Sequence, residues 1–97
     1  MRGPDVLRGR SSPLNATIKM LLARTGRLAV DVNLLADDQD LYSAGLTSFA
    51  TVQLMLALEE AFDVEFPERM LNRRTFASIG AIEACVSEIS GAREAAA

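Results

Sequence analysis

The segment Asp40-Leu41-Tyr42-Ser43-Ala44-Gly45-Leu46-Thr47-Ser48-Phe49 is followed by a long apolar run that ends at Phe62-Asp63. Gly45 breaks the backbone three residues before Ser48, and we expect a helix to begin at Thr47 or Ser48 and to end at Phe62. The Ser48 hydroxyl then lies at a helix N-terminus. It either caps the helix by accepting a hydrogen bond from a first-turn amide, or serves as an attachment point, where a phosphodiester is stabilised by the helix dipole.

The composition indicates one small acidic domain. The chain has 97 residues, of which 49 % are hydrophobic, with few aromatics and no Trp, so its core must consist mainly of Leu, Ile, Val and Met. The net charge is −3; residues 1–13 hold three Arg and one Asp, hence +2, which leaves −5 for the remainder. Such a body lacks the basic face of a nucleic-acid binder and suits partners with basic docking patches.

The single cysteine, Cys85, excludes an internal disulfide and fits a reducing compartment. No apolar run approaches the ~18 residues that a membrane span requires, and the N-terminus lacks the apolar core of a signal peptide. We therefore expect a cytoplasmic protein that does not bind membranes. No dimer seam stands out, so we expect a monomer.

Apolar periodicity predicts an all-α fold, namely a small four-helix bundle of three longer helices and one short helix, with a long first loop. The first helix begins at Ser12-Pro13 and ends before Gly26. Its one-sided apolar stripe comprises Leu14, Ile18, Leu21, Leu22 and Thr25. We expect residues 13–91 to form the domain, residues 1–12 a disordered lead, and residues 92–97 a frayed tail.

After the second helix, Pro67 opens the short helix, residues 68–72, in which Met70 and Leu71 should point inward. The last helix should begin near Ser78 as a cap and end at Gly91. Its narrow core stripe comprises Ile79, Ile82, Val86 and Ile89.

The connection from Leu28 to Leu46 shows neither a helical nor a strand period. A loop of this length is normally functional or is held to the core by its own apolar residues. Candidates for that anchoring are Val30, Val32, Leu34, Leu35, Leu41 and Leu46. Asp37, Asp38 and Asp40 should face water; because they lack the glycine and glutamate offsets of a calcium loop, we expect no metal site.

The second helix is apolar on two sides. At about 100° per residue, one arc forms the core face and contains Thr51, Leu54, Met55, Leu58 and Phe62. A second stripe of Phe49, Val52 and Leu56 is rimmed by Gln53, Glu59, Glu60 and Asp63. The second stripe either packs under the long loop or forms an exposed surface that binds a partner.

Nothing in the sequence predicts an enzyme. Histidine is absent, so neither Cys85 nor Ser48 has an imidazole to activate it. Glu59 and Glu60 are neighbours on a helix and diverge by ~100°, so they are not a catalytic carboxylate pair.

Residues 41–63 resemble the signature of acyl and peptidyl carrier proteins. The shared features are a loop leucine, the glycine three residues before Ser48, an apolar residue after it, and a helix that closes in Leu-Glu-Glu-x-Phe. Phe66-Pro67 is similar to the step before the family's short third helix, and Thr75-Phe76-Ala77-Ser78-Ile79 to the entry of its last helix. The resemblance covers roughly residues 14–90 and agrees with the helix layout above.

The resemblance implies a carrier phosphoprotein. A phosphopantetheinyl transferase would join 4′-phosphopantetheine from coenzyme A to Ser48, and the thiol of this arm would hold an acyl or aminoacyl group as a thioester. A ligase would load the cargo, and a downstream transferase would receive it. The resemblance also implies that partner enzymes dock on Thr47, Phe49, Val52, Leu56, Glu59 and Glu60.

The chain also departs from the family. Thr47 stands where many members have Asp, and Ala50 and Gln53 stand at positions that are often acidic in fatty-acid carriers. Arg73-Arg74 further dilute the negative face. Residues 42–49 are similar to small free-standing aminoacyl carriers, which are loaded by a dedicated ligase resembling an aminoacyl-tRNA synthetase. We therefore expect a stand-alone aminoacyl carrier. The alternatives are an acyl carrier of a polyketide or lipid pathway, and a helical interaction module without the arm.

Overall fold

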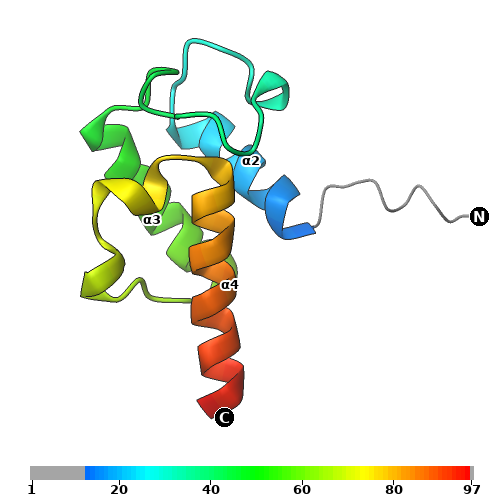
Figure 1. Cartoon of the computed structure of the whole chain (residues 1–97), viewed down its shortest axis with the longest axis vertical. Coiled ribbons are helices and arrows are strands. Elements are labelled where there is room, and N and C mark those ends of the chain that lie inside the picture. Colours follow the sequence, from blue (N-terminus) through cyan, green and yellow to red (C-terminus); the bar gives the residue numbers. More distant parts are fainter. Residues whose placement is uncertain (1–12, 97) are drawn as a thin grey trace, which may run out of the picture.

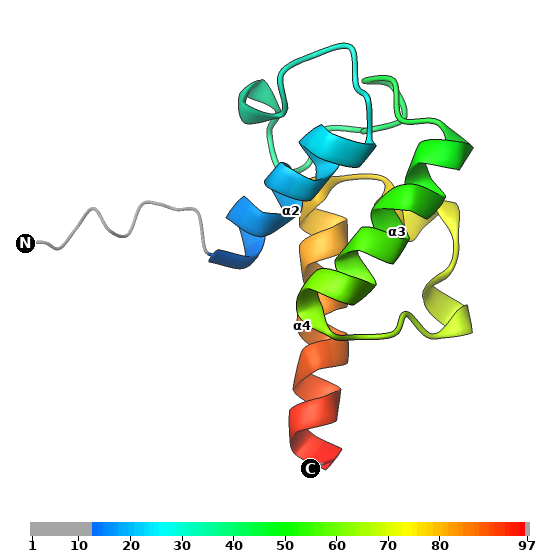
Figure 2. The same ribbon diagram turned by 180° about the vertical axis from the view of Figure 1, so that it is seen from behind.

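The computed structural model describes residues 13–96, with the backbone alone for residues 92–96. This part of the chain is all-helical and has no strand. Its elements are α2 (Pro13–Thr25), η1 (Val32–Leu34), α3 (Ser48–Phe62), η2 (Glu68–Met70), η3 (Arg73–Phe76) and α4 (Ile79–Ala96), where η denotes a 3₁₀ helix. α2 packs against α3 and α4, and the C-terminal part of α4 extends past the other helices (Figures 1 and 2).

The all-α class is confirmed, but the expected count of four helices is not. In place of the short helix predicted at residues 68–72, there are two 3₁₀ helices, η2 and η3, and Asn72 lies between them. Its side-chain amide donates to the Arg69 carbonyl (3.0 Å), and its Oδ1 accepts from the Thr75 amide (3.0 Å). Such local side-chain bonds compete with a continuous helix. Met70 is buried as predicted, but Leu71, between the turns, is 48 % exposed, so its predicted inward orientation was wrong.

The last helix begins where the sequence predicts and continues further. Ser78 Oγ accepts a hydrogen bond from the Ala81 amide (3.1 Å), as a cap does, and the predicted core stripe is buried throughout. Gly91 does not end the helix, which continues to Ala96. A helical glycine costs only about 1 kcal/mol relative to alanine, and the residues after it are mostly strong helix formers. The predicted lead, residues 1–12, and the predicted cap at Ser12 lie outside the described residues.

The long connection is held to the start of α4 by its backbone. The Leu41 amide donates to the Ala77 carbonyl (2.7 Å), and the Gly80 amide donates to the Asp37 carbonyl (2.8 Å). A Cβ atom on Gly80 would lie 3.2 Å from that carbonyl oxygen, so glycine permits the close approach. The loop therefore has a defined path over one end of the helices (Figure 1).

Four of the six apolar residues expected to anchor this connection do so: Val32, Leu35, Leu41 and Leu46 are buried. Val30 and Leu34 are 45 % and 79 % exposed, so that part of the prediction was wrong. Asp31 caps the short helix η1 by accepting from the Asn33 amide (2.9 Å). In this turn Val32 takes the core position, and the other side of the turn faces water.

The core face of α3 is narrower than predicted. Leu54 and Leu58 are fully buried, and Ala50, one turn earlier, is buried with them. The remaining predicted core residues are only half-buried: Thr51, Met55 and Phe62. Phe66 and Phe76, from segments without periodicity, complete the core with ring centroids 5.5 Å apart. None of the helices within residues 13–96 is both long and apolar enough to cross a membrane.

The two faces of α3 predict different effects on stability. We expect Leu54→Ala to lower the free energy of unfolding by about 2–5 kcal/mol, because the side chain is 0 % exposed and its loss leaves a cavity. Leu56→Ala removes the same atoms from a side chain that is 54 % exposed, and should cost about 0.5 kcal/mol or less. Urea denaturation of both variants measures the difference; equal losses would contradict the two-face description.

Candidate functional site

A tight turn immediately before α3 fixes the direction in which the helix begins. Gly45 has a φ of +115°, a conformation that favours glycine. The Leu46 amide donates to the Leu41 carbonyl (3.0 Å), and the side chains of both residues are buried on either side of the turn. Residues 47 and 48 therefore follow a loop that is anchored to the core.

Thr47, not Ser48, caps α3. Thr47 has an extended backbone, and its Oγ1 accepts a hydrogen bond from the Ala50 amide (3.1 Å). Ser48 is the first helical residue; its side chain is exposed and its hydroxyl makes no hydrogen bond with any residue in the described part of the chain. The interpretation of Ser48 as the helix cap was therefore wrong, because Thr47 is the cap. The Ser48 hydroxyl is left accessible at the positive end of a 15-residue helix.

Next to this hydroxyl lies an apolar surface, which we call the α3 patch: Phe49, Val52 and Leu56. These side chains are 74 %, 51 % and 54 % exposed, so the alternative in which they pack under the long loop was wrong. The first turn of α3 contains no acidic residue. Contiguous exposed apolar side chains of this kind are typical of a binding surface.

The two predicted acidic docking residues differ. Glu60 is exposed. Glu59 is half-buried, and its Oε2 accepts a hydrogen bond from the Phe66 amide (2.9 Å), so it also holds the segment that follows α3. The C-terminus of α3 is closed by Asp63, whose φ of +53° is a left-handed conformation that Asp tolerates.

A hollow of about 410 Å³ opens beside Ser48, between α3 and the residues of η3. Its apolar part is formed by Val52, Met55, Leu71 and Phe76, and its polar part by Tyr42, Ser48, Thr51, Asn72 and Arg73. The sequence did not predict this hollow, because its far wall depends on the interruption of residues 68–76 into two turns. The exposed Leu71 follows from the same interruption.

Tyr42 and Arg73 form a contact across the edge of the hollow. The guanidinium carbon of Arg73 lies 3.9 Å from the centroid of the Tyr42 ring, a cation–π geometry. The Tyr42 hydroxyl donates to the Arg73 carbonyl (3.0 Å). The loop before α3 and the start of η3, 31 residues apart, are joined twice by this pair.

Two of the predicted water-facing aspartates of the loop, Asp37 and Asp40, have hydrogen-bond partners. Asp40 accepts hydrogen bonds from the Ser43 hydroxyl (2.9 Å) and the Tyr42 amide (3.0 Å), which hold the pKa of its carboxyl below the usual value; the charge of Arg73 adds a smaller effect. Asp37 accepts from the Asn15 side chain (3.3 Å). Within the described residues, no three potential metal ligands of the His, Cys, Asp and Glu types come together.

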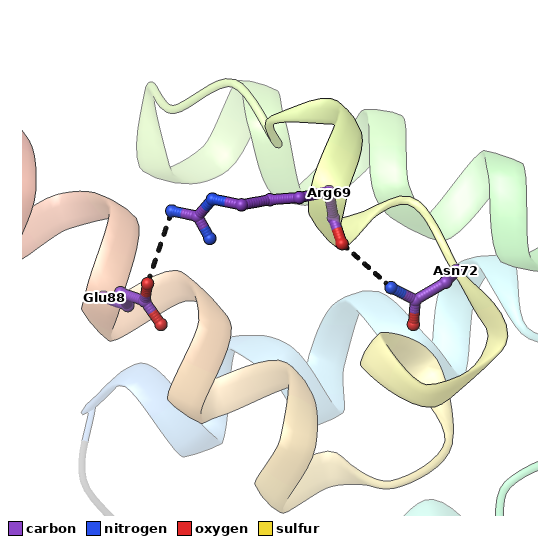
Figure 3. A network of polar contacts seen from close by, with 3 residues as sticks. All are labelled: Arg69, Asn72 and Glu88. Carbon is purple, nitrogen blue, oxygen red and sulfur yellow. Dashed lines mark hydrogen bonds and ion pairs between the residues drawn. The ribbon is translucent and has the colours of Figure 1, made fainter.

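The segment of residues 68–76, which lines the hollow opposite α3, is fastened to α4. Figure 3 shows Arg69 reaching from η2 to Glu88 of α4, with 3.4 Å between their charged groups, while Asn72 bonds the Arg69 carbonyl. Both side chains of the ion pair are largely exposed, so the pair contributes little to stability. Burial of Met70 and Phe76 is the stronger attachment.

Residues 16–86 match the family described as phosphopantetheine attachment site. The chain belongs to this family. The resemblance to carrier proteins that the sequence indicated is therefore confirmed, and the family's prosthetic group is 4′-phosphopantetheine.

Individual proteins are also similar to this chain over most of its length. An aminoacyl carrier protein from Agrobacterium fabrum (strain C58 / ATCC 33970) is 58 % identical over 83 residues, which cover 86 % of this chain and 100 % of the relative. A solution structure of a protein from Agrobacterium tumefaciens is 58 % identical, with a TM-score of 0.67, and covers 84 % of this chain and 98 % of that one.

Two crystal structures also contain a chain similar to this one. Both are of an engineered Bradyrhizobium japonicum glycine:carrier protein ligase complexed with a carrier protein from Agrobacterium tumefaciens. In the complex with AMP, the matching chain is 60 % identical with a TM-score of 0.74, covering 75 % of this chain and 97 % of that one. In the complex with ATP, the values are 59 % and 0.76, with 78 % and 99 % covered.

The residues present fit the group. A phosphodiester needs an accessible hydroxyl, and Ser48 offers one without breaking any hydrogen bond, because Thr47 already satisfies the Ala50 amide. The helix N-terminus favours the negative charge. The adjoining hollow offers an apolar surface next to Ser48.

The capping assignment gives a test on the unmodified protein. Thr47→Ala should lower the free energy of unfolding by about 1 kcal/mol, because the Ala50 amide loses its partner. Ser48→Ala should change it by about 0.5 kcal/mol or less, since the exposed hydroxyl bonds nothing. Thermal and urea unfolding compare these neighbours directly. A larger loss for Ser48→Ala would mean that Ser48 is the cap.

Proposed function

We propose that this protein is an aminoacyl carrier whose 4′-phosphopantetheine arm is joined to Ser48. The observation that carries the proposal is the free, exposed hydroxyl of Ser48 at the first position of α3, beside the exposed α3 patch. The choice of an aminoacyl cargo is supported by 58 % identity to a protein named as an aminoacyl carrier.

In the attachment reaction, Ser48 Oγ forms a bond to the phosphorus that bears the pantetheine of coenzyme A. The bond between that phosphorus and the bridging oxygen of the pyrophosphate breaks, adenosine 3′,5′-bisphosphate leaves with this oxygen, and the hydroxyl proton passes to a base. This chain has no histidine, and the described residues place no side chain in hydrogen-bond contact with the hydroxyl. The base therefore belongs to a separate transferase. The attached arm supplies a thiol, on which an aminoacyl group is held as a thioester.

The loading enzyme is proposed to be a ligase that activates an amino acid with ATP. The support is that a similar carrier protein is found with a glycine:carrier protein ligase, in complexes with ATP and with AMP. Five of the predicted docking residues are exposed: Thr47, Phe49, Val52, Leu56 and Glu60. The sixth, Glu59, is half-buried and accepts a hydrogen bond from the Phe66 amide. A downstream transferase that receives the cargo is expected to use the same residues.

The absence of acidic residues in the first part of α3 bears on which partner docks there. The residues of α3 from Ser48 to Leu58 carry no charge, and the first acid is Glu59. A partner that relies on a ring of acids next to the serine finds none here, whereas an apolar contact with the α3 patch is available. We further propose that the protein acts in the cytoplasm, in keeping with its single free cysteine.

The proposal predicts a covalent change at one residue. Incubation with a phosphopantetheinyl transferase and coenzyme A should add the mass of one phosphopantetheine to the protein, and peptide mapping should place it on Ser48. Ser48→Ala should gain no mass, while Ser43→Ala, a neighbouring exposed serine, should be modified normally. Protein that is unmodified in its native cells and inert to several transferases would favour the interaction-module alternative.

The α3 patch predicts an effect on loading that is separate from folding. Phe49→Ala should lower kcat/KM for aminoacylation by the ligase about tenfold or more, because Phe49 is the largest exposed apolar side chain beside Ser48. Met20→Ala is the matched control: Met20 is 52 % exposed but lies on α2, and it should leave loading unchanged. Equal effects of the two variants would remove the α3 patch from the docking surface.

A further inference from the structure

We propose that Arg73, held against Tyr42, binds the phosphodiester that joins the arm to Ser48. The inference rests on the proposed function, in that it assumes attachment at Ser48. It assigns to Arg73 a role in holding the arm's anionic end, and to Tyr42 the role of positioning the Arg73 guanidinium.

Arg73 is the only charged residue among those that line the hollow beside Ser48. The other polar groups of this lining are neutral hydroxyls and an amide, from Tyr42, Ser48, Thr51 and Asn72. A singly charged anion attached at Ser48 would therefore find one side-chain countercharge in the hollow. A guanidinium suits it, because two of its N–H groups can bond two phosphate oxygens at once.

The guanidinium is restrained before any anion arrives. It stacks on the Tyr42 ring at 3.9 Å, and the Tyr42 hydroxyl holds the Arg73 backbone carbonyl at 3.0 Å. Tyr42 is held in turn, since its amide donates to Asp40 (3.0 Å). A side chain that is already ordered loses less conformational entropy on binding than a free arginine does.

The charge of Arg73 is not neutralised by an ion pair. Within the described residues Arg69 is paired with Glu88, whereas Arg73 lies within ion-pair distance of no carboxylate. The charge of Arg73 is only a minor cause of the lowered pKa of the Asp40 carboxyl. Each carboxylate oxygen of Asp40 already accepts a hydrogen bond from its own loop. Arg73 therefore keeps the capacity to bind an anion.

Arg74 provides a matched control for the test. Arg73 and Arg74 are adjacent, and both are exposed. Replacing either one by Gln removes one positive charge from the chain. Only Arg73 lines the hollow and stacks on Tyr42. The experiment compares the unmodified and arm-bearing forms of the full chain as wild type, Arg73→Gln, Arg74→Gln and Arg73→Lys. Intact mass and peptide mapping first establish attachment at Ser48, which tests the proposed function by itself.

Two readouts then test Arg73 without any ligase. Attachment should raise the melting temperature of wild type and Arg74→Gln by roughly 2–4 °C more than that of Arg73→Gln, as expected for one exposed charge-assisted contact in a domain of this size. This difference should shrink at about 1 M salt. The ³¹P resonance of the arm should move in Arg73→Gln relative to wild type and should not move in Arg74→Gln. Arg73→Lys, which keeps the charge without the planar fork, should retain part of both effects.

The outcomes separate the two proposals. If Ser48 is modified but Arg73→Gln and Arg74→Gln give the same attachment-induced melting shift and the same ³¹P resonance, the role of Arg73 is overturned and the carrier function stands. If the arm attaches elsewhere or not at all, the proposed function fails and this inference fails with it. A fold defect would lower the melting temperature of the unmodified Arg73→Gln as well, and the comparison within each variant removes that effect.

Discussion

The hydrogen bond from the Ala50 amide to the Thr47 hydroxyl determines what the rest of the site can do. A helix start leaves several amides without partners, and a nearby hydroxyl is normally used to satisfy one of them. Here Thr47 meets that requirement, and Ser48, one position later, is released from it. The buried side chains of Leu41 and Leu46 and the left-handed Gly45 fix where this start occurs. An accessible hydroxyl at a stable helix terminus therefore depends on the residue before it.

The same helix serves the core and a surface, which suits a domain this small. Leu54 and Leu58 are fully buried, while the α3 patch is exposed on another side of α3. A small domain buries a limited share of its surface, so a helix that is apolar on two sides cannot be fully covered by the two other helices and three short turns found within residues 13–96. The exposed large apolar side chains of α3 begin at Phe49, next to Ser48, and continue to Leu56. We infer that exposure here reflects binding and not incomplete packing.

The sequence predicted the features that depend on local patterns. The bounds of α3, the cap at Ser78 and the buried stripe of the last helix all follow from spacing and capping chemistry, and Ser48 stood out because its flanking residues resemble a family signature. What could not be predicted depends on competition between local and tertiary interactions. Asn72 divides residues 68–76 because its side chain bonds the backbone on both sides. Leu71 is exposed as a result, and the hollow beside Ser48 exists only with that geometry. Gly91 failed as a helix stop because a glycine ends a helix reliably only where the next residues also favour ending it.

Charge placement distinguishes the two sides of the site. The N-terminal part of α3 carries no acid, so encounter with a partner cannot be steered from there by charge, and we propose that contact with the α3 patch supplies the discrimination. Across the hollow, Arg73 places a single cation where most of the lining is apolar or neutral. A cation in that position is of no use to a partner that approaches with Lys or Arg, because like charges repel. Under the two proposals made above, the cation serves the phosphodiester joined to Ser48, and the apolar side chains of the α3 patch serve the partner.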